Sequence, residues 1–173
     1  MMLDIEPAAV STTLRIANLA DLPAVLAMHR RCSADSLYRR YVSGAGAPSA
    51  ELLARLLEPQ IGGTVLAVVT GGAEDGHIVA AGHLVGCGYQ TAEAAILVED
   101  AWQRRGLGTA LARWLAELAR RAAVAAVLVH VLAGNQPATR TIRRLTGDGT
   151  LSGPTPVERD GPLVTLSLAV GER

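Results

Sequence analysis

The clearest chemical feature of this sequence is a glycine turn, Gln103 to Gly108, between a strand-like run and a helical one. Glycines let a backbone approach a ligand closely, and the start of a helix presents free N–H groups at the positive end of the helix dipole. An anion is therefore expected at this turn, and phosphate is the commonest such anion. The alternative interpretation is an ordinary connection between a strand and a helix.

Two common nucleotide-binding motifs do not fit this turn. A Walker A loop requires Gly-Lys-Ser/Thr, whereas all 16 basic residues of this chain are arginines. A dinucleotide-binding fingerprint requires a third glycine at the position of Leu111. The absence of lysine also excludes chemistry that proceeds through a lysine Schiff base.

An acid upstream of the turn is the candidate for proton transfer. Residues 92–98 are typical of a strand, whose alternation puts Glu93, Ala95 and Leu97 on one face. Glu93 is then an acid within an otherwise apolar run. A carboxylate at such a place can accept the proton that an attacking amine must lose, directly or through a water. The alternative is an exposed acid near the end of a strand.

The surrounding pattern predicts a mixed α/β sheet in one domain, residues 12–173, preceded by a flexible segment, residues 1–11. Residues 146–156 are rich in turn formers and leave room for a short strand. The continuous apolar run 124–132 is expected to be a strand buried on both faces. Strands are predicted over 14–18, 64–70, 78–85, 92–98, 124–132 and 163–170, and helices over 21–31, 33–41, 51–57, 106–121 and 135–145.

Composition excludes several classes of function. The formal net charge is +0 and aromatic residues make up 3% of the chain, so neither nucleic acid nor a membrane surface is expected as a partner. Cys32 and Cys87 are far apart in sequence, and His77 and His83 are six strand residues apart, so no metal site is expected. With no signal peptide and no apolar stretch that could span a bilayer, the sequence predicts a cytoplasmic protein.

The glycine turn resembles the pyrophosphate-binding motif of the GNAT superfamily of acyl-CoA-dependent N-acyltransferases, Gln/Arg-x-x-Gly-x-Gly/Ala. The motif is matched at Gln103, Gly106 and Gly108, and the order of elements looks like that fold across nearly the whole chain. The resemblance implies a GNAT fold with a mixed, mostly antiparallel sheet of about six to seven strands and about four to five helices. It also implies acetyl-CoA as the acyl donor.

By that resemblance, the backbone of Leu97 and Val98 would pair with the pantetheine arm of acetyl-CoA, and Val98 N–H could polarise the thioester carbonyl. Asn135 looks like the residue that contacts the pantetheine region, although it could simply cap its helix. The side chains of Arg104 and Arg105 either contact CoA phosphates or stay solvated. The pyrophosphate would be held by the amides of Gln103, Arg104, Arg105, Gly106, Leu107, Gly108 and Thr109.

The stretch from Thr91 to Gln103 looks like the corresponding part of bacterial protein lysine acetyltransferases, in which a glutamate at this offset from the motif glutamine is the proposed general base. Glu93 occupies that position. The segment from Ser33 to Tyr41 is similar to the same group's Ser-x-x-Ser-x-x-x-Arg-aromatic helix, which borders the acceptor cleft. Tyr38, Arg40 and Tyr41 are therefore candidate cleft residues, with ordinary helix packing and a surface arginine as the alternative.

One departure concerns the superfamily's frequent general-acid tyrosine, whose place is taken by Thr141-Ile142. The sequence as a whole predicts a bacterial, cytoplasmic N-acetyltransferase in which an amine attacks acetyl-CoA directly, with Glu93 as base. A protein lysine is the first expected acceptor. The alternatives are a small amine, such as an aminoglycoside, a polyamine or an amino acid, and a non-catalytic acyl-CoA-binding sensor module.

Overall fold

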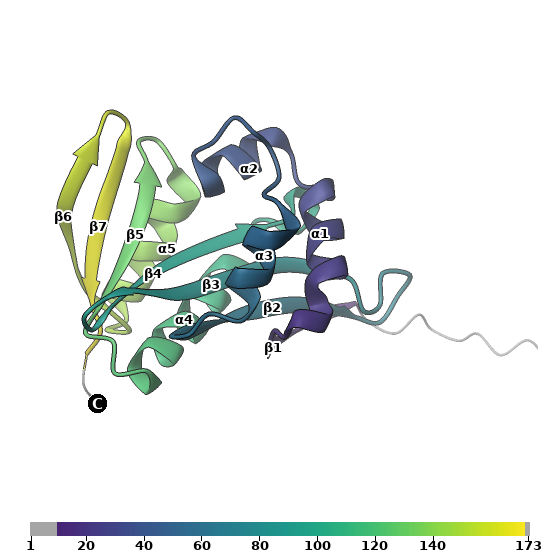
Figure 1. Ribbon diagram of the computed structural model, residues 1–173, viewed down its shortest axis with the longest axis horizontal. Coiled ribbons are helices and arrows are strands. Elements are labelled where there is room, and N and C mark those ends of the chain that lie inside the picture. The colour runs from purple at the N-terminus through teal and green to yellow at the C-terminus, as the bar shows by residue number, and fades with distance from the viewer. Residues whose placement is uncertain (1–9, 172–173) are drawn as a thin grey trace, which may run out of the picture.

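The computed structural model describes residues 10–171, which form a seven-stranded mixed sheet with five α-helices (Figure 1). The strand order is β1-β2-β3-β4-β5-β7-β6, and β4 and β5 are the parallel neighbours in an otherwise antiparallel sheet. The predicted fold class is confirmed. Most of segment 1–11, for which flexibility is predicted, lies outside the described residues, and β1 begins at Ser11.

The strands are β1 (Ser11–Ile16), β2 (Gly62–Thr70), β3 (Ile78–Gly88), β4 (Thr91–Val98), β5 (Ala126–Leu132), β6 (Ser152–Asp160) and β7 (Leu163–Ala169). The helices are α1 (Leu22–Arg31), α2 (Ala34–Tyr41), α3 (Ala50–Leu57), α4 (Leu107–Arg121) and α5 (Gln136–Gly147), with short 3-10 turns at η1 (Leu19–Asp21) and η2 (Asp100–Trp102). Of the helices formed by residues 10–171, none is long and apolar enough to cross a membrane.

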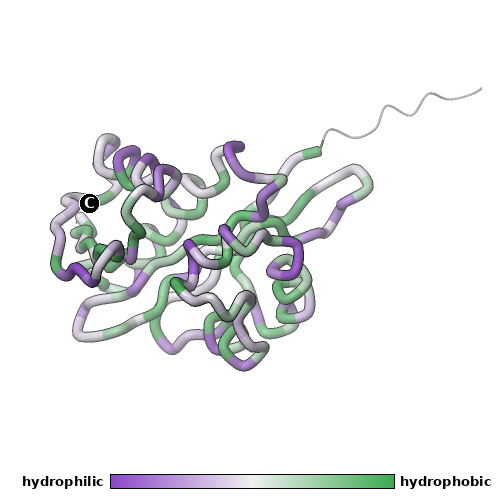
Figure 2. Tube along the Cα trace, turned by 90° about the horizontal axis from the view of Figure 1, so that it is seen from above, coloured by the Kyte–Doolittle hydropathy of each residue, from purple (hydrophilic) through white to green (hydrophobic). Residues whose placement is uncertain are grey.

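Alternation along β2 explains why the sheet is covered on both faces. Val65, Ala67 and Val69 pack against the apolar side of α4, whereas Leu66 and Val68 pack against α1 and α3. Figure 2 shows these central strands as an apolar band between more polar segments. Helix α4 packs closely on β3 at Gly82, which has no side chain; a Cβ added there would lie 3.2 Å from Leu115 Cδ1. The two cores fix β4, which carries Glu93, between them.

Three differences from the sequence prediction have a clear physical cause. Strand β1 ends two residues earlier than predicted, because Asn18 instead forms a capping box with Asp21 that starts η1. Strand β6 spans nine residues rather than a short stretch, and all nine are exposed, so it has no apolar alternation to recognise. The expectation that β5 is buried on both faces is wrong, since only Val127 is fully buried.

Candidate active site

Strands β4 and β5 separate after three residue pairs, and this separation creates the main cavity. In the described structure they pair at Thr91 with Ala126, Ala92 with Val127, and Glu93 with Leu128. Beyond Glu93 a cavity of about 580 Å³ opens between them, which is why β5 is only half buried. Within residues 10–171, the backbone edge of β4 that faces this opening has no strand to pair with beyond Glu93. Val98 O accepts a hydrogen bond from Gln103 Nε2, and the Val98 N–H is left available to a ligand.

The glycine turn forms one end of this cavity. Arg104 and Gly106 adopt left-handed backbone conformations, with φ of +61° and +85°, and Gly106 is the N-cap of α4. No side chain of the described residues caps the first turn of α4, so its N–H groups point freely toward the opening. The cavity is lined here by Gln103, Arg104, Gly106, Leu107, Gly108 and Thr109.

The two arginines of the turn point in different directions. Arg104 lines the cavity, whereas the guanidinium carbon of Arg105 lies 4.5 Å from the centre of the Trp102 ring, beside β1 rather than in the cavity. From α5, Arg140 and Arg144 also line the cavity. The positive charge at this end therefore comes from Arg104 and from α5.

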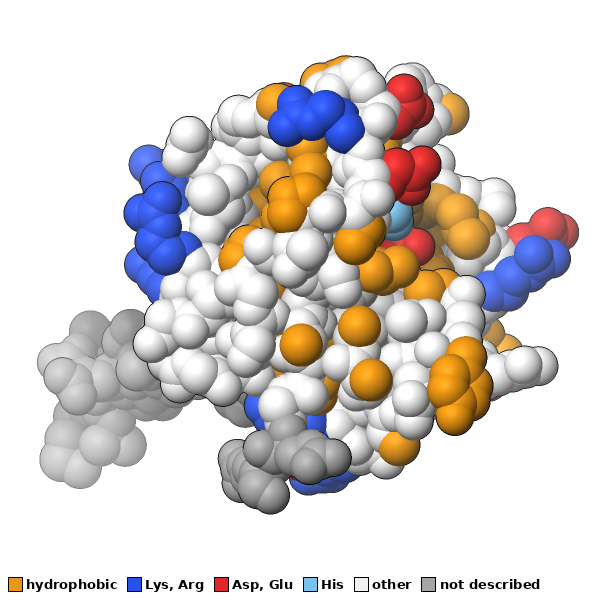
Figure 3. Space-filling model, turned by 90° about the vertical axis from the view of Figure 1, so that its left-hand side faces the viewer, with side chains coloured by type: hydrophobic (Ala, Val, Ile, Leu, Met, Phe, Trp, Pro, Cys, Tyr) orange, Lys and Arg blue, Asp and Glu red, His pale blue; other side chains and the backbone are white. Residues whose placement is uncertain are grey.

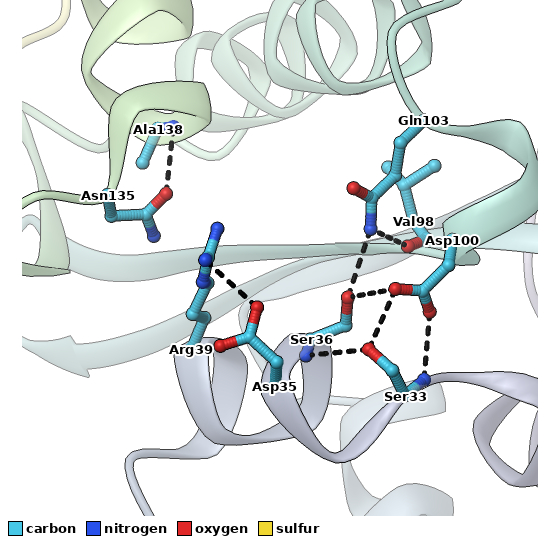
Figure 4. Close-up of polar contacts among 9 residues, drawn as sticks. All are labelled: Ser33, Asp35, Ser36, Arg39, Val98, Asp100, Gln103, Asn135 and Ala138. Atoms are coloured by element: carbon cyan, nitrogen blue, oxygen red, sulfur yellow. Dashed lines mark hydrogen bonds and ion pairs between the residues drawn. The ribbon is translucent and has the colours of Figure 1, made fainter.

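The start of α5 forms the opposite wall. Asn135 lines the cavity, and its Oδ1 accepts a hydrogen bond of 3.2 Å from Ala138 N, so its side chain caps the helix (Figure 4). Thr141 lines the same wall at the position where the superfamily frequently has a tyrosine, and its Oγ1 would lie 3.8 Å from a Cβ on Gly108. Helices α4 and α5 thus meet closely where their N-terminal ends border the cavity.

Glu93 lies at the narrow end, where the strands part. Its side chain is 44% exposed, and its Oε2 lies 3.5 Å from Nε2 of His130 on β5. His130 Nδ1 is in turn 2.9 Å from Thr165 Oγ1 on β7. Figure 3 shows a histidine between acidic side chains on the face of the molecule that carries β6. Sequence reasoning did not select His130, although it is the one polar residue in the apolar run 124–132.

The side chain of Gln103 holds the glycine turn in place in the described structure. Its Nε2 donates to Val98 O (3.1 Å) and to Ser36 Oγ (3.0 Å), which ties the glycine turn to the end of β4 and to α2. Asp100 completes this contact, because its carboxylate accepts hydrogen bonds from Ser33 N, Ser33 Oγ and Ser36 Oγ at 2.7–2.9 Å (Figure 4). Asp100 was not predicted; its partners lie more than 60 residues earlier in the chain.

The three residues that the sequence predicts to border the acceptor cleft, Tyr38, Arg40 and Tyr41, lie in three different environments. Arg40 lines the cavity, Tyr38 is 44% exposed, and Tyr41 is turned inward, with its hydroxyl 2.7 Å from His29 Nε2. His29 Nδ1 lies 2.8 Å from Val25 O and must carry a proton to bond it, so Nε2 accepts from Tyr41. Of these three residues, the structure brings Arg40 together with Glu93. Leu97 and Val98 line the cavity wall beside them.

The hydrogen bonds that Asp100 accepts from Ser33 and Ser36 make the free energy of unfolding depend on pH. Burial by itself raises the pKa of Asp100, but the hydrogen bonds from Ser33 and Ser36 outweigh it and hold the pKa below its usual value. A carboxylate with a depressed pKa in the folded state stabilises the protein above the unfolded pKa of about 4, and this stabilisation is lost as the pH falls through the folded pKa. We expect Asp100→Ala to lower the free energy of unfolding at pH 7 by about 1 kcal/mol or more, because Ser33 and Ser36 lose their hydrogen bonds to a charged carboxylate.

Urea unfolding at pH 7 and at pH 2.5 (about 1.5 units below the reference pKa of an aspartate) checks this expectation. The difference between parent and variant should shrink at the lower pH. Asp35→Ala is the matched control, since its exposed carboxylate pairs with Arg39 on the same helix and with no other cation among residues 10–171. A difference for Asp100→Ala that is the same at both pH values would contradict the assignment.

A divergent pair of parallel strands, next to a glycine turn that opens a helix, defines the acyl-CoA-binding class of acetyltransferases. The acetyltransferase (GNAT) family model matches residues 34–147, and the chain belongs to this family. This is the family that the sequence predicts. Among residues 10–171, no group of three or more His, Cys, Asp or Glu side chains is placed to hold a metal ion.

Solved structures share this fold. The GNAT domain of PAT from S. lividans is 21% identical over 90% of this chain and 89% of that one, with a TM-score of 0.75. The structure of yncA from Salmonella typhimurium with its cofactor acetyl-CoA is 20% identical over 94% and 95%, with a TM-score of 0.65. The ribosomal-protein-S18-alanine N-acetyltransferase from Escherichia coli is 21% identical over 92% and 93%, with a TM-score of 0.61. No curated protein matches this chain in sequence.

Proposed function

We propose that this protein transfers the acetyl group of acetyl-CoA to a primary amine, with Glu93 as the general base. The observation that carries the proposal is the position of Glu93 at the point where β4 and β5 part, beside the free backbone edge of β4. The edge at Leu97 and Val98 suits the amides of pantetheine, and the uncapped start of α4 suits pyrophosphate. Arg104, Arg140 and Arg144 add positive charge at the phosphate end.

The chemistry at this site is a direct acyl transfer. The ammonium of the acceptor gives one proton to Glu93, and the resulting amine attacks the thioester carbon. The C–N bond forms and the C–S bond breaks, so CoA departs as a thiolate, which then takes up the second proton that the new amide nitrogen releases. Val98 N–H supplies a hydrogen bond to the carbonyl oxygen as negative charge develops there. A thiol has a reference pKa of about 8.5, so the thiolate departs without a dedicated acid and the threonine at 141 is tolerated.

The experiment that tests this function measures binding and turnover separately. Thermal stabilisation by acetyl-CoA reports binding, and release of free CoA thiol with a panel of amines reports turnover. Each amine is paired with the alcohol of the same skeleton, and the product is identified by mass, so N-acetylation is distinguished from O-acetylation. Stabilisation without turnover of any amine would favour the sensor module, to which the absent tyrosine lends support. A lack of stabilisation would overturn the proposal.

The two arginines of the glycine turn offer a matched test of the phosphate end. We expect Arg104→Ala to weaken acetyl-CoA binding about tenfold, since a hydrogen bond to a charged group contributes about 1.5–3 kcal/mol. Arg105→Ala should leave the affinity within about twofold, because Arg105 stacks on Trp102. Isothermal titration of both variants with acetyl-CoA checks this. Equal losses in the two variants would contradict the proposed position of the phosphates.

A further inference from the structure

Arg40 is a half-buried cation in the wall of the cavity. It projects from α2 over the ring of Tyr41, with its guanidinium carbon 4.4 Å from the ring centre. Its Nε is shielded from solvent and has no hydrogen-bond partner among residues 10–171, and none of the ion pairs formed within those residues includes it. Its neighbour Arg39, in contrast, pairs with Asp35 at 2.9 Å.

The surrounding groups do not neutralise this charge. Burial lowers the pKa of Arg40, while Tyr41 and Glu93 act in the opposite direction. Glu93 is thus close enough to influence Arg40 electrostatically, but the two side chains form no ion pair. A guanidinium nitrogen that is shielded from solvent and unpaired is costly for the folded state, and arginine's planar set of donors can form two parallel hydrogen bonds to one carboxylate.

A second unpartnered atom lies on the same side of the sheet. His83 pairs with Ala95 across β3 and β4, so its side chain shares the face of Glu93. Thr64 Oγ1 donates to Leu56 O and so accepts from His83 Nδ1, which leaves Nε2 as a buried acceptor without a partner in the described residues. Burial lowers the pKa of His83 to about 3, so the ring is neutral. It can accept a hydrogen bond but supplies no negative charge.

We propose that Arg40 binds an acidic group of the acceptor, so that the acceptor is a small amine of the amino acid class, carrying its own carboxylate. This inference rests on the proposed function, because it takes Glu93 as the residue that receives the amine's proton. A zwitterion fits the opposite charges of Glu93 and Arg40, with its ammonium toward Glu93 and its carboxylate toward Arg40. A polyamine would bring a second cation against Arg40, and a lysine side chain would leave the guanidinium unpaired.

The test compares amino acids with their own carboxamides as acceptors. Each pair keeps the amine and the side chain and removes only the negative charge; spermidine and a lysine-containing peptide complete the panel. We expect the parent protein to prefer the acids by about 30-fold or more in kcat/KM, the usual consequence of removing one member of a buried charge pair. Equal rates for acids and amides, or a preference for spermidine or the peptide, would overturn this inference and leave the proposed function intact.

Variants separate a binding role of Arg40 from a structural one. Arg40→Met keeps the volume of the side chain and should abolish the preference for acids without lowering the thermal midpoint, since no internal ion pair is lost. Arg39→Gln, the matched control, also removes an arginine that lines the cavity, but one already paired with Asp35, so it should keep the preference. Equal losses on acid and amide in Arg40→Met would show a structural role and overturn the inference. If no acceptor is turned over, the same pairs are compared as ligands of the CoA-loaded parent protein, and equal stabilisation by acids and amides overturns it.

Discussion

Replacing Glu93 with glutamine is expected to lower kcat by about 10²–10⁴-fold, the usual contribution of a general base. Glutamine keeps the size of the side chain and its hydrogen-bonding oxygen but cannot accept a proton from the ammonium of the acceptor. Acetyl-CoA binding should stay within about twofold, because the phosphate end of the cavity is formed by other elements. CoA release at saturating substrate and titration with acetyl-CoA measure the two quantities.

A matched change elsewhere distinguishes this effect from a general loss of charge. Glu158→Gln alters an exposed glutamate on β6 and should leave kcat unchanged. Raising the pH should partly restore turnover by Glu93→Gln, because a larger share of the amine is then already deprotonated in solution. If Glu93→Gln retained the parent's kcat at neutral pH, the base would have to be another group. His130, 3.5 Å away, would be the first to test.

Replacing Gly62 with alanine is expected to lower the free energy of unfolding by about 3 kcal/mol or more, which places it among the severe single substitutions. A Cβ at this position would lie 2.0 Å from the carbonyl oxygen of Leu84, and that oxygen belongs to the backbone of β3. The φ of +103° is also unfavourable for any residue with a side chain. Either β2 or β3 would have to move, and both strands support β4.

Gly76→Ala provides the control for backbone conformation alone. Gly76 has a φ of +81°, but a Cβ there would meet nothing within 4 Å. Its substitution should cost about 1 kcal/mol, the usual effect of placing a side chain in the left-handed region. Denaturant unfolding of both variants gives the comparison. Similar losses for the two would mean that Leu84 O moves aside easily, contrary to the expected clash.

The sequence predicted the elements that have a strong local pattern. The periodic run of α4, the β-branched runs of β2 and β3, and the glycine turn all have the predicted type. Strand β6 was underestimated because its residues are exposed throughout and two prolines interrupt it, so no alternation marks it. The burial of β5 was misjudged because a continuous apolar run is typical of a strand that is covered on both faces. In the structure, β5 turns away from β4 after Leu128, and the cavity exposes it there.

Local sequence order relates the candidate site residues only where they are close in the chain, whereas Arg40 and Asn135, which also line the cavity, were selected by resemblance. Glu93 and the turn belong to one strand–turn–helix unit, so their relation follows from local order. The contacts of Asp100 with α2 join residues 64 and 67 positions apart, and no periodicity reports them. The opposite directions of Arg104 and Arg105 follow from the positive φ of Arg104, a backbone state that an arginine seldom adopts and that its type does not reveal.

Because β4 and β5 share three residue pairs in the described structure, the sheet consists of two halves, β1-β2-β3-β4 and β5-β7-β6. These halves are held together largely by α4, against which Ile142 and Leu145 of α5 also pack. A molecule that contacts both borders of the opening binds the assembled halves and has no equivalent site on the unfolded chain. Its binding therefore also stabilises the folded arrangement of the two halves against unfolding, by about 2.7 kcal/mol at a ligand concentration one hundred times Kd. The concentration of acyl-CoA would thereby affect the protein's resistance to unfolding as well as its rate of turnover.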